Sequence, residues 1–80
     1  MDGQKSVAIY TTPTCGFCKM AKAFFRDKDI VYTEYSVMED VAARTAMLDK
    51  SGQSGVPVID VGGELVIGFD QSRLEELLGL

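Results

Sequence analysis

The fold of this chain is decided by one stretch of sequence, Ser6-Val7-Ala8-Ile9-Tyr10-Thr11-Thr12-Pro13-Thr14-Cys15-Gly16-Phe17-Cys18. Residues 6–11 are rich in β-branched and aromatic side chains without strict polar alternation, which is typical of a strand buried on both faces. We expect this to be the central strand. Pro13 and Gly16 then interrupt the pattern. Apolar residues next recur at spacings of three and four, which predicts a helix from Cys15 to Lys28 with one apolar face of Phe17, Met20, Ala21, Phe24 and Phe25.

A second strand and a second helix follow. Residues 30–35 alternate as a strand should, and the short links on either side of the first helix predict that the two strands pair in parallel. Ser36 and Glu39 match a capping box, so we expect the second helix to start at Ser36. Gly52 should end it in a left-handed conformation. The residues expected to face inward from this helix are Val41, Ala42, Met47 and Leu48.

The C-terminal third predicts a hairpin and a last helix. Residues 56–61 and 64–67 are strand-like, and Gly62-Gly63 between them can take positive φ at both turn positions. Asp70 or Ser72 can cap the last helix. Its core-facing residues should be Leu74, Leu77 and Leu78, with Gly79 beyond its end. The whole order predicts an α/β fold: a mixed four-stranded sheet with helices on both sides.

Composition narrows the class of protein. The 80 residues are 46% hydrophobic and 25% charged, which is typical of a globular chain, and we expect a single domain over residues 1–80. The net charge of −4 disfavours nucleic acid as a partner. The apolar run from Val7 to Tyr10 is far shorter than the ~20 residues that span a bilayer or the ~7–15 of a signal peptide core. We therefore expect a cytoplasmic protein without a membrane partner.

The chain has 2 cysteines and no histidine. A disulfide between Cys15 and Cys18 would close too short a loop to link distant parts of the chain. The two cysteines therefore belong to a local site. A zinc or iron–sulfur centre needs about four protein ligands, which one copy of this chain lacks. A metal shared across a dimer and a pair of inert buried cysteines stay open at this point.

Cys15 and Cys18 lie where a buried strand turns into a helix. At a helix N-terminus, backbone N–H groups without intrahelical acceptors point at the first side chain, and the helix dipole adds to their effect. Both favour the thiolate form of Cys15. The main benefit is expected when Cys15 leaves as a thiolate, because nucleophilicity itself falls as a thiol becomes more acidic. Lys19 and Lys22 on the same helix are interpreted as a solvated face.

Three segments together resemble a known family. Residues 9–18 with their Cys-Gly-Phe-Cys site, residues 55–58 (Gly-Val-Pro-Val) and residues 68–70 (Gly-Phe-Asp) are similar to the glutaredoxins and glutaredoxin-like redoxins over nearly the whole chain. The resemblance implies a minimal thioredoxin fold (βαβ-ββα). It also implies a dithiol thiol–disulfide oxidoreductase, with Cys15 as the exposed nucleophile and Cys18 as the resolving thiol. The implied substrates are protein disulfides or glutathione mixed disulfides, for a monomer with no metal and no tightly bound cofactor.

The resemblance carries further roles by position. It implies that Val56 offers its backbone N–H and C=O to the substrate and that the Val56-Pro57 bond is cis. The γ-glutamyl end of glutathione, the possible co-substrate, would lie at the start of the last helix. The residues in that place are Gly68, Phe69, Asp70 and Gln71, and for Asp70 a plain helix cap is an equally good interpretation.

Departures from the family pattern concern the electron donor. Thr12 stands where glutathione-using members commonly carry a Lys, and Gln53 stands where a second basic residue often lies. We therefore expect weak use of glutathione, unless Arg44, Lys19 or helix N-termini replace these charges, and a flavoprotein of the thioredoxin-reductase type is the other expected donor. Phe17 is either an exposed aromatic for substrate contact or the edge of the core.

One alternative of another class stays open. Some relatives form a dimer that bridges a [2Fe–2S] cluster through the first cysteine and two glutathiones, and so act as cluster carriers. In this chain the cysteine would be Cys15.

Overall fold

The computed structural model describes residues 5–53 and 55–80. Within them, four strands and three helices follow one another as β1 (Val7–Thr11), α1 (Gly16–Asp27), β2 (Thr33–Ser36), α2 (Val41–Ser51), β3 (Val58–Val61), β4 (Glu64–Ile67) and α3 (Gln71–Leu78). This is the predicted order of strands and helices. Cys15 and Lys28, the predicted ends of the first helix, are its N-cap and C-cap.

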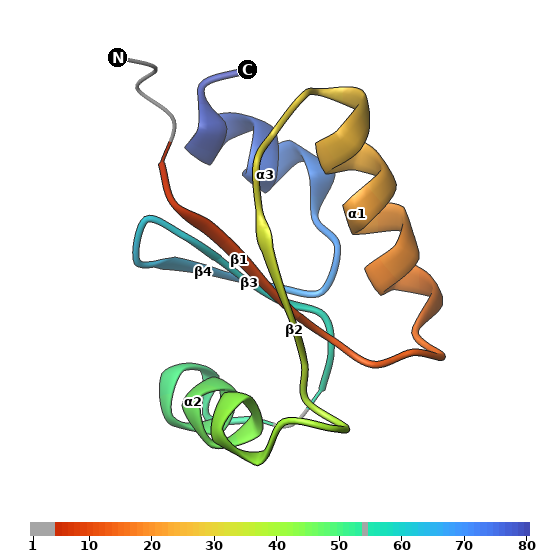
Figure 1. Ribbon diagram of the computed structural model, residues 1–80. Coiled ribbons are helices and arrows are strands. Elements are labelled where there is room, and N and C mark those ends of the chain that lie inside the picture. The colour runs from red at the N-terminus through yellow and green to blue at the C-terminus, as the bar shows by residue number, and fades with distance from the viewer. Residues whose placement is uncertain (1–4, 54) are drawn as a thin grey trace.

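The strands form one mixed sheet in the order β2-β1-β3-β4. β1 pairs in parallel with β2, where Ala8 lies beside Thr33, and antiparallel with β3. β3 and β4 form the predicted antiparallel hairpin. As Figure 1 shows, α1 and α3 cover one face of the sheet and α2 covers the other. The expected central position of β1 is therefore confirmed, and both of its faces are covered.

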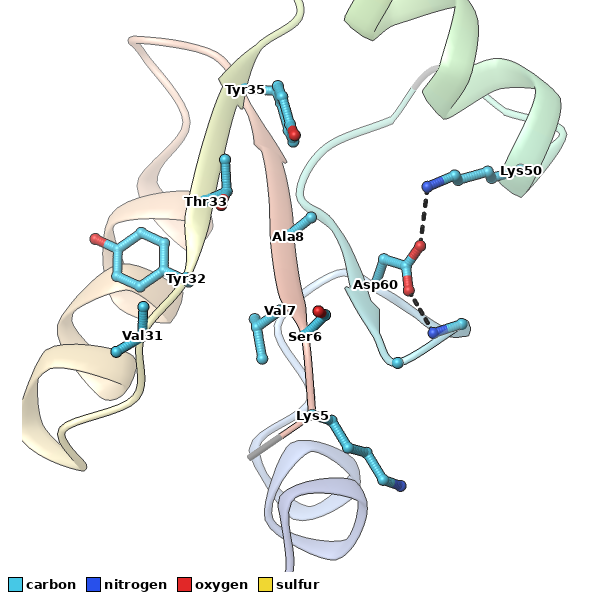
Figure 2. Close-up of a pocket in the computed structure, with 12 residues that line it drawn as sticks. Lys5, Ser6, Val7, Ala8, Val31, Tyr32, Thr33, Tyr35, Lys50 and Asp60 are labelled. Carbon is cyan, nitrogen blue, oxygen red and sulfur yellow. Dashed lines mark hydrogen bonds and ion pairs between the residues drawn. The ribbon is translucent and has the colours of Figure 1, made fainter. Parts of the chain in front are cut away.

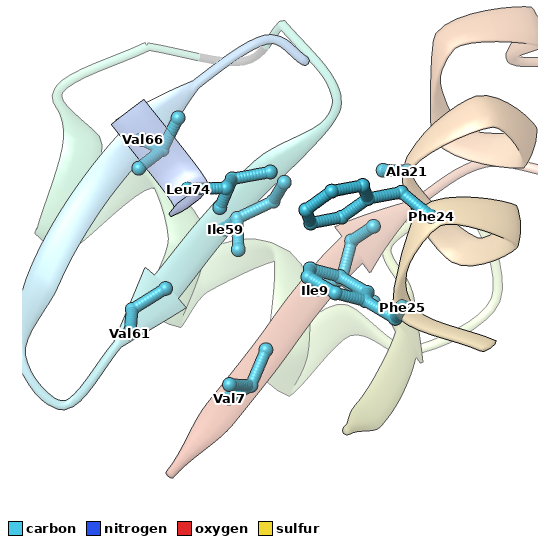
Figure 3. Close-up of a cluster of buried hydrophobic side chains, with 9 residues drawn as sticks. All are labelled: Val7, Ile9, Ala21, Phe24, Phe25, Ile59, Val61, Val66 and Leu74. Atoms are coloured by element: carbon cyan, nitrogen blue, oxygen red, sulfur yellow. The ribbon is translucent and has the colours of Figure 1, made fainter. Parts of the chain in front are cut away.

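Two clusters of buried side chains hold these layers together. The larger lies between the sheet and the two helices α1 and α3 (Figure 3) and consists of Val7, Ile9, Ala21, Phe24, Phe25, Ile59, Val61, Val66 and Leu74. The smaller lies on the α2 side and consists of Tyr10, Val37, Ala43, Met47 and Val58. Strand β1 contributes to both clusters because its successive side chains point to opposite faces.

The second strand is shorter than predicted, since β2 begins at Thr33 and the prediction was Ile30. The reason is the way α1 ends. Asp29 takes a left-handed conformation with φ of 56°, and the N–H of Ile30 donates to the carbonyl of Phe25 at 2.8 Å. These contacts keep the chain beside the end of the helix, so it reaches β1 only at Thr33.

The predicted start of the second helix is wrong. Ser36 stays in β2, and the helix begins at Val41 with Asp40 as its N-cap. An Asp40 carboxylate oxygen accepts from the N–H of Ala43 at 3.0 Å. Val37 is buried against Tyr10, so the chain has to place this side chain in the core before the helix can start. The Ser36 hydroxyl is buried and has no hydrogen-bond partner among the described residues.

The later start changes which side of α2 faces the sheet. Ala43 and Met47 are buried, whereas Val41 is 79% exposed and Leu48 is 37% exposed. Only Met47 of the predicted inward set is therefore buried, and Ala42 is exposed as well. Ala43 and Met47 are four residues apart and so share one helix face.

The C-terminal predictions are largely confirmed. Gly62 and Gly63 take φ of 58° and 96°, so the turn uses the conformation that glycine adopts without strain. β3 begins at Val58, two residues later than predicted. Asp70 is the N-cap of α3 and Gly79 its left-handed C-cap. Leu74 is fully buried, and Leu77 and Leu78 pack against the larger cluster.

Candidate active site

Cys15 lies at the junction between β1 and α1. A turn leads into it, closed by a hydrogen bond of 3.3 Å from the Cys15 N–H to the Thr12 carbonyl. Cys15 has an extended backbone, with φ of −84° and ψ of 113°, and is the N-cap of the helix. Its Sγ accepts from the N–H of Cys18 at 3.1 Å. The expected contact between a helix N–H group and the Cys15 sulfur is therefore present.

Cys18 has the opposite surroundings. Cys15 is partly exposed, but Cys18 is only 1% exposed. Burial, and after it the hydrogen bond with Cys15, raise the pKa of the Cys18 thiol to about 12. Neither cysteine forms a disulfide in this structure. The pair thus combines one accessible sulfur with one buried thiol a helical turn away.

Phe17 lies between the two cysteines and points outward. Its side chain is 61% exposed, and Met20, one turn further along α1, is 51% exposed. Phe17 belongs to neither of the two buried clusters. Of the two interpretations of Phe17, the exposed aromatic is therefore correct, and its role in substrate contact stays a prediction.

The Val56-Pro57 segment leads into β3. The peptide bond between these residues is cis, as the resemblance implied. Pro57 is fully buried, and Val56 is half-buried against the smaller cluster. Among the described residues, the N–H and C=O of Val56 have no backbone partner. The Pro57 carbonyl accepts from the N–H of Gly68 at 2.8 Å, which ties this segment to the start of α3.

Side chains in the segment from Gly68 to Gln71 already form contacts with other residues of the chain. The ring of Phe69 packs edge-on against Phe24, with centroids 5.9 Å apart. An Asp70 carboxylate oxygen accepts from the Arg73 N–H at 3.1 Å, which confirms the plain helix cap. Gln71 donates to a Glu75 carboxylate oxygen at 3.2 Å along its own helix. Gly68 has φ of 79°.

Thr12 borders a cavity of about 350 Å³. Its other walls are Val37, Met38, Arg44 and Met47, from the loop before α2 and from α2 itself. Arg44 forms no salt bridge within the described residues. The cavity on the Thr12 side of the cysteines therefore has one cation on its wall, although position 12 itself is neutral.

Comparison with known proteins identifies the family. The family model for glutaredoxin matches residues 7–66, which include both cysteines and the Val56-Pro57 segment. The chain belongs to the glutaredoxin family.

Individual relatives agree with this assignment. A glutaredoxin-like 8.6 kDa protein of the rubredoxin operon of Clostridium pasteurianum is 38% identical over 90% of this chain and 96% of its own. Glutaredoxin 3 of Escherichia coli K12 is 34% identical over 81% of this chain and 78% of its own. The crystal structure of the thioredoxin-like protein BC3987 is 33% identical, with a TM-score of 0.86 over 91% of this chain and 100% of that one.

These similarities confirm the predicted minimal thioredoxin fold. Family and fold together support a thiol–disulfide oxidoreductase role, which is the coarse function predicted from the sequence. Glutaredoxins as a family typically use glutathione as co-substrate. The roles of individual residues are taken up below.

Lys22 differs from its predicted solvated state in this glutaredoxin-family chain. Its side chain is only 24% exposed, and its Nζ lies 2.9 Å from a Glu34 carboxylate oxygen of β2. The same oxygen accepts from the Thr11 hydroxyl at 2.9 Å. The hydrogen bond from Lys22 holds the pKa of the Glu34 carboxyl below its usual range. Nothing in the local sequence signals this contact, because the two charged residues are 12 positions apart.

A larger cavity, of about 600 Å³, lies at the other end of β1 (Figure 2). It contains no cysteine. On its wall, Lys50 and Asp60 form an ion pair of 2.9 Å, and Asp60 also accepts from the N–H of Gly63. The smaller cavity is not lined by a cysteine either, but its Thr12 carbonyl accepts from the N–H of Cys15, so we assign the candidate site to the cysteines and this neighbouring cavity.

Two further findings concern the described residues as a set. In residues 5–53 and 55–80, no three Cys, His, Asp or Glu side chains gather in a way that could hold a metal ion. None of the helices in that part of the chain has the length and apolar character that a bilayer span requires.

Proposed function

We propose that this chain is a dithiol thiol–disulfide oxidoreductase in which Cys15 attacks the substrate disulfide and Cys18 resolves the mixed disulfide. One observation carries the proposal: the Sγ of the partly exposed Cys15 accepts the N–H of Cys18 at 3.1 Å, while Cys18 itself is buried. The N–H group stabilises negative charge on Cys15 in the reduced state and when Cys15 departs as a leaving group.

In the first exchange, the Cys15 thiolate attacks one sulfur of the substrate disulfide. A Cys15–substrate disulfide forms, the substrate S–S bond breaks, and the other substrate sulfur leaves as a thiolate that takes up a proton. The exposure of Cys15 and Phe17 allows a protein disulfide to approach this sulfur.

In the second exchange, Cys18 gives up its proton and attacks the Cys15 sulfur of the mixed disulfide. The Cys15–Cys18 disulfide forms, and the remaining substrate sulfur leaves and is protonated. The two cysteines are thereby oxidised and the substrate disulfide is reduced by two electrons. A donor must then return both cysteines to the thiol state.

The unpaired backbone of Val56 supports a docking role for this segment. An extended substrate strand can pair, as with a sheet edge, with the N–H and C=O of Val56, which have no backbone partner among the described residues. The hydrogen bond between Gly68 and Pro57 joins this edge to the start of α3. We propose that the substrate chain crosses between Phe17 and Val56, and that Gly68 to Gln71 border its path.

For the donor, we propose weak use of glutathione and efficient use of a thioredoxin-reductase-type flavoprotein. Thr12 is neutral, and the Gln53 side chain already donates to the Gly55 carbonyl. A charge-assisted bond from a positioned Lys is typically worth about 1.5–3 kcal/mol, and neither residue supplies one. Among the described residues, Arg44 is the one cation that lines the Thr12 cavity, so its contribution to glutathione binding should be measured.

The experiment is NADPH consumption coupled to reduction of a protein disulfide substrate such as insulin. One reaction contains glutathione and its reductase, and the other contains thioredoxin reductase. Turnover with the flavoprotein alone supports the proposed donor. Efficient turnover with glutathione at millimolar or lower concentration contradicts the donor proposal and leaves the dithiol mechanism intact. No turnover with either donor contradicts the enzymatic role.

The same sample tests the predicted monomer and the cluster carrier. A [2Fe–2S] cluster would need ligands from a second copy and from glutathione, because the described residues contain no cluster of metal-binding side chains. A colourless protein that elutes as a monomer after anaerobic purification supports the oxidoreductase. Visible absorption together with inorganic sulfide and a dimer would support the carrier. Cell fractionation tests the predicted cytoplasmic location.

A further inference from the structure

The second exchange needs a thiolate on Cys18, which the surroundings of this residue disfavour. Cys18 is 1% exposed, and its pKa is about 12 in the reduced protein. At pH 7 very few molecules would then carry a Cys18 thiolate, the form that attacks a disulfide. Resolution of the mixed disulfide therefore depends on whatever favours this thiolate at the moment of attack.

The electrostatic surroundings of Cys18 change when Cys15 enters the mixed disulfide. In the reduced protein, Cys15 raises the pKa of Cys18 through a hydrogen bond and through its charge. Once Cys15 is bonded to the substrate, it carries no charge, and both contributions are lost. Burial then opposes the Cys18 thiolate, and the Thr12 backbone and the Lys22 ammonium favour it.

The position of Lys22 on α1 allows its charge to act on Cys18. It follows Cys18 by four residues on α1, so the two side chains share one helix face. Three quarters of the Lys22 side chain is buried, which a freely solvated lysine would not be. Its aliphatic stem therefore lies largely against the protein, its ammonium is 2.9 Å from Glu34, and its charge acts on the Cys18 thiol.

Glu34 holds the ammonium in place. Lys22 Nζ and Thr11 Oγ1 both donate to the same Glu34 carboxylate oxygen at 2.9 Å. Thr11 is 2% exposed and is the last residue of β1, directly before Thr12. Arg26, one turn beyond Lys22, also favours the Glu34 carboxylate. Three neighbouring elements, α1, β1 and β2, therefore fix the position of the Lys22 charge.

We propose that Lys22, anchored by Glu34 and Thr11, is a positioning residue for the second exchange, where its ammonium favours the Cys18 thiolate that attacks the mixed disulfide. The proposal rests on the proposed dithiol function. The proton of Cys18 passes to solvent and is balanced by the proton that the departing substrate thiolate takes up. Lys22 keeps its own proton throughout and contacts no substrate.

The competing explanation is a purely structural ion pair that joins α1 to β2. Ion pairs that solvent still reaches contribute little to stability, and the loss of a purely structural pair would affect all steps alike. The electrostatic role predicts a specific change in one step and in its pH profile. A measurement that separates the two exchanges therefore decides between the explanations.

Single-turnover reaction with the aromatic disulfide dithiobis(nitrobenzoate) separates them. Attack by Cys15 releases one coloured thiolate at a rate that rises with reagent concentration, and attack by Cys18 releases a second at a rate independent of it. The variants are Lys22→Met, which keeps the aliphatic stem, and Lys22→Arg, which keeps the charge. Lys28→Met removes the same charge from the far end of α1 as a matched control.

We expect Lys22→Met to slow the second phase about three- to tenfold at pH 7 and to move its pH profile toward higher pH, with the first phase unchanged. Lys22→Arg should retain at least half of the wild-type rate, and Lys28→Met should match wild type. An unchanged second phase, or equal slowing of both phases with a lower melting temperature, overturns the role of Lys22. A wild-type protein that releases only one thiolate overturns the dithiol function itself.

Discussion

The two ends of strand β1 differ in how far their polar groups are already paired. At the amino end, the larger cavity is lined by Asp60, which accepts from Lys50 and from Gly63, and Lys50 also donates to Tyr10. At the carboxyl end, the Val56 backbone and the Arg44 side chain have no such partner among the described residues. Unsatisfied bonding capacity at the end of β1 that leads to Cys15, and not cavity volume, is therefore the feature on which we base the proposed site.

The sharpest way to test this comparison is to remove the reactive sulfur. Cys15→Ser should lower the rate of disulfide reduction by roughly a thousandfold or more, because no other exposed thiol remains in the chain. The expected result is no mixed disulfide by mass spectrometry after reaction with a disulfide substrate.

The wild-type protein provides the check on this assignment. Brief alkylation with iodoacetamide at pH 6, followed by peptide mapping, should label Cys15 and spare Cys18, which is buried with a pKa of about 12. Equal labelling of the two thiols would contradict the assignment of Cys15 as the nucleophile.

A second test keeps the nucleophile and removes the resolving thiol. Cys18→Ser should form the mixed disulfide through Cys15 and stay trapped in it when glutathione is absent. Multiple-turnover reduction should then fall by about a hundredfold or more while the first thiolate release persists. Intact-protein mass spectrometry should show the covalent adduct, and sustained turnover by this variant would count against the resolving role.

A smaller effect is expected at the Thr12 cavity. Arg44→Gln should raise the KM for glutathione about three- to tenfold with little change in kcat, because it removes the cation on the cavity wall. Arg73→Gln removes another exposed charge, from α3, and should leave KM unchanged. Identical KM values for the Arg44 variant and wild type would show that Arg44 plays no part in donor binding.

The smallest effect is predicted at the amino end. Lys50→Met should leave disulfide reduction unchanged and lower the free energy of unfolding by less than about 1 kcal/mol, since the lysine side chain is 43% exposed. The hydrogen bond to Asp60 raises the pKa of Lys50 above its usual value. The contribution of the ion pair is therefore fully present below about pH 10.4 and is lost as pH rises through the higher folded-state pKa.

Urea unfolding from pH 7 to pH 11 measures this contribution. Wild type should lose stability relative to Lys50→Met across the alkaline part of the range. A clear loss of disulfide reduction in Lys50→Met would break the comparison, because it would place function at the amino end as well.

Local patterns in the sequence determined most of the fold and the reactive pair. Three features depend only on neighbours within a few residues: the buried strand before Pro13, the helix that begins after Cys15 and the Gly62-Gly63 hairpin. The local sequence therefore predicts them directly. The spacing of Cys15 and Cys18 across one helical turn placed one sulfur at the helix N-terminus. The cis bond before Pro57 came from the family resemblance and not from local chemistry.

Tertiary contacts decided what these patterns leave open. Both Ser36 and Asp40 can cap a helix. Asp40 caps α2 because Val37, which lies between them, is buried against Tyr10 of β1. The place of Lys22 beside Glu34, and of Arg44 beside Thr12, likewise depends on residues 12 and 32 positions away. Such partners are set by how the helices pack across the sheet, which no short window of sequence contains.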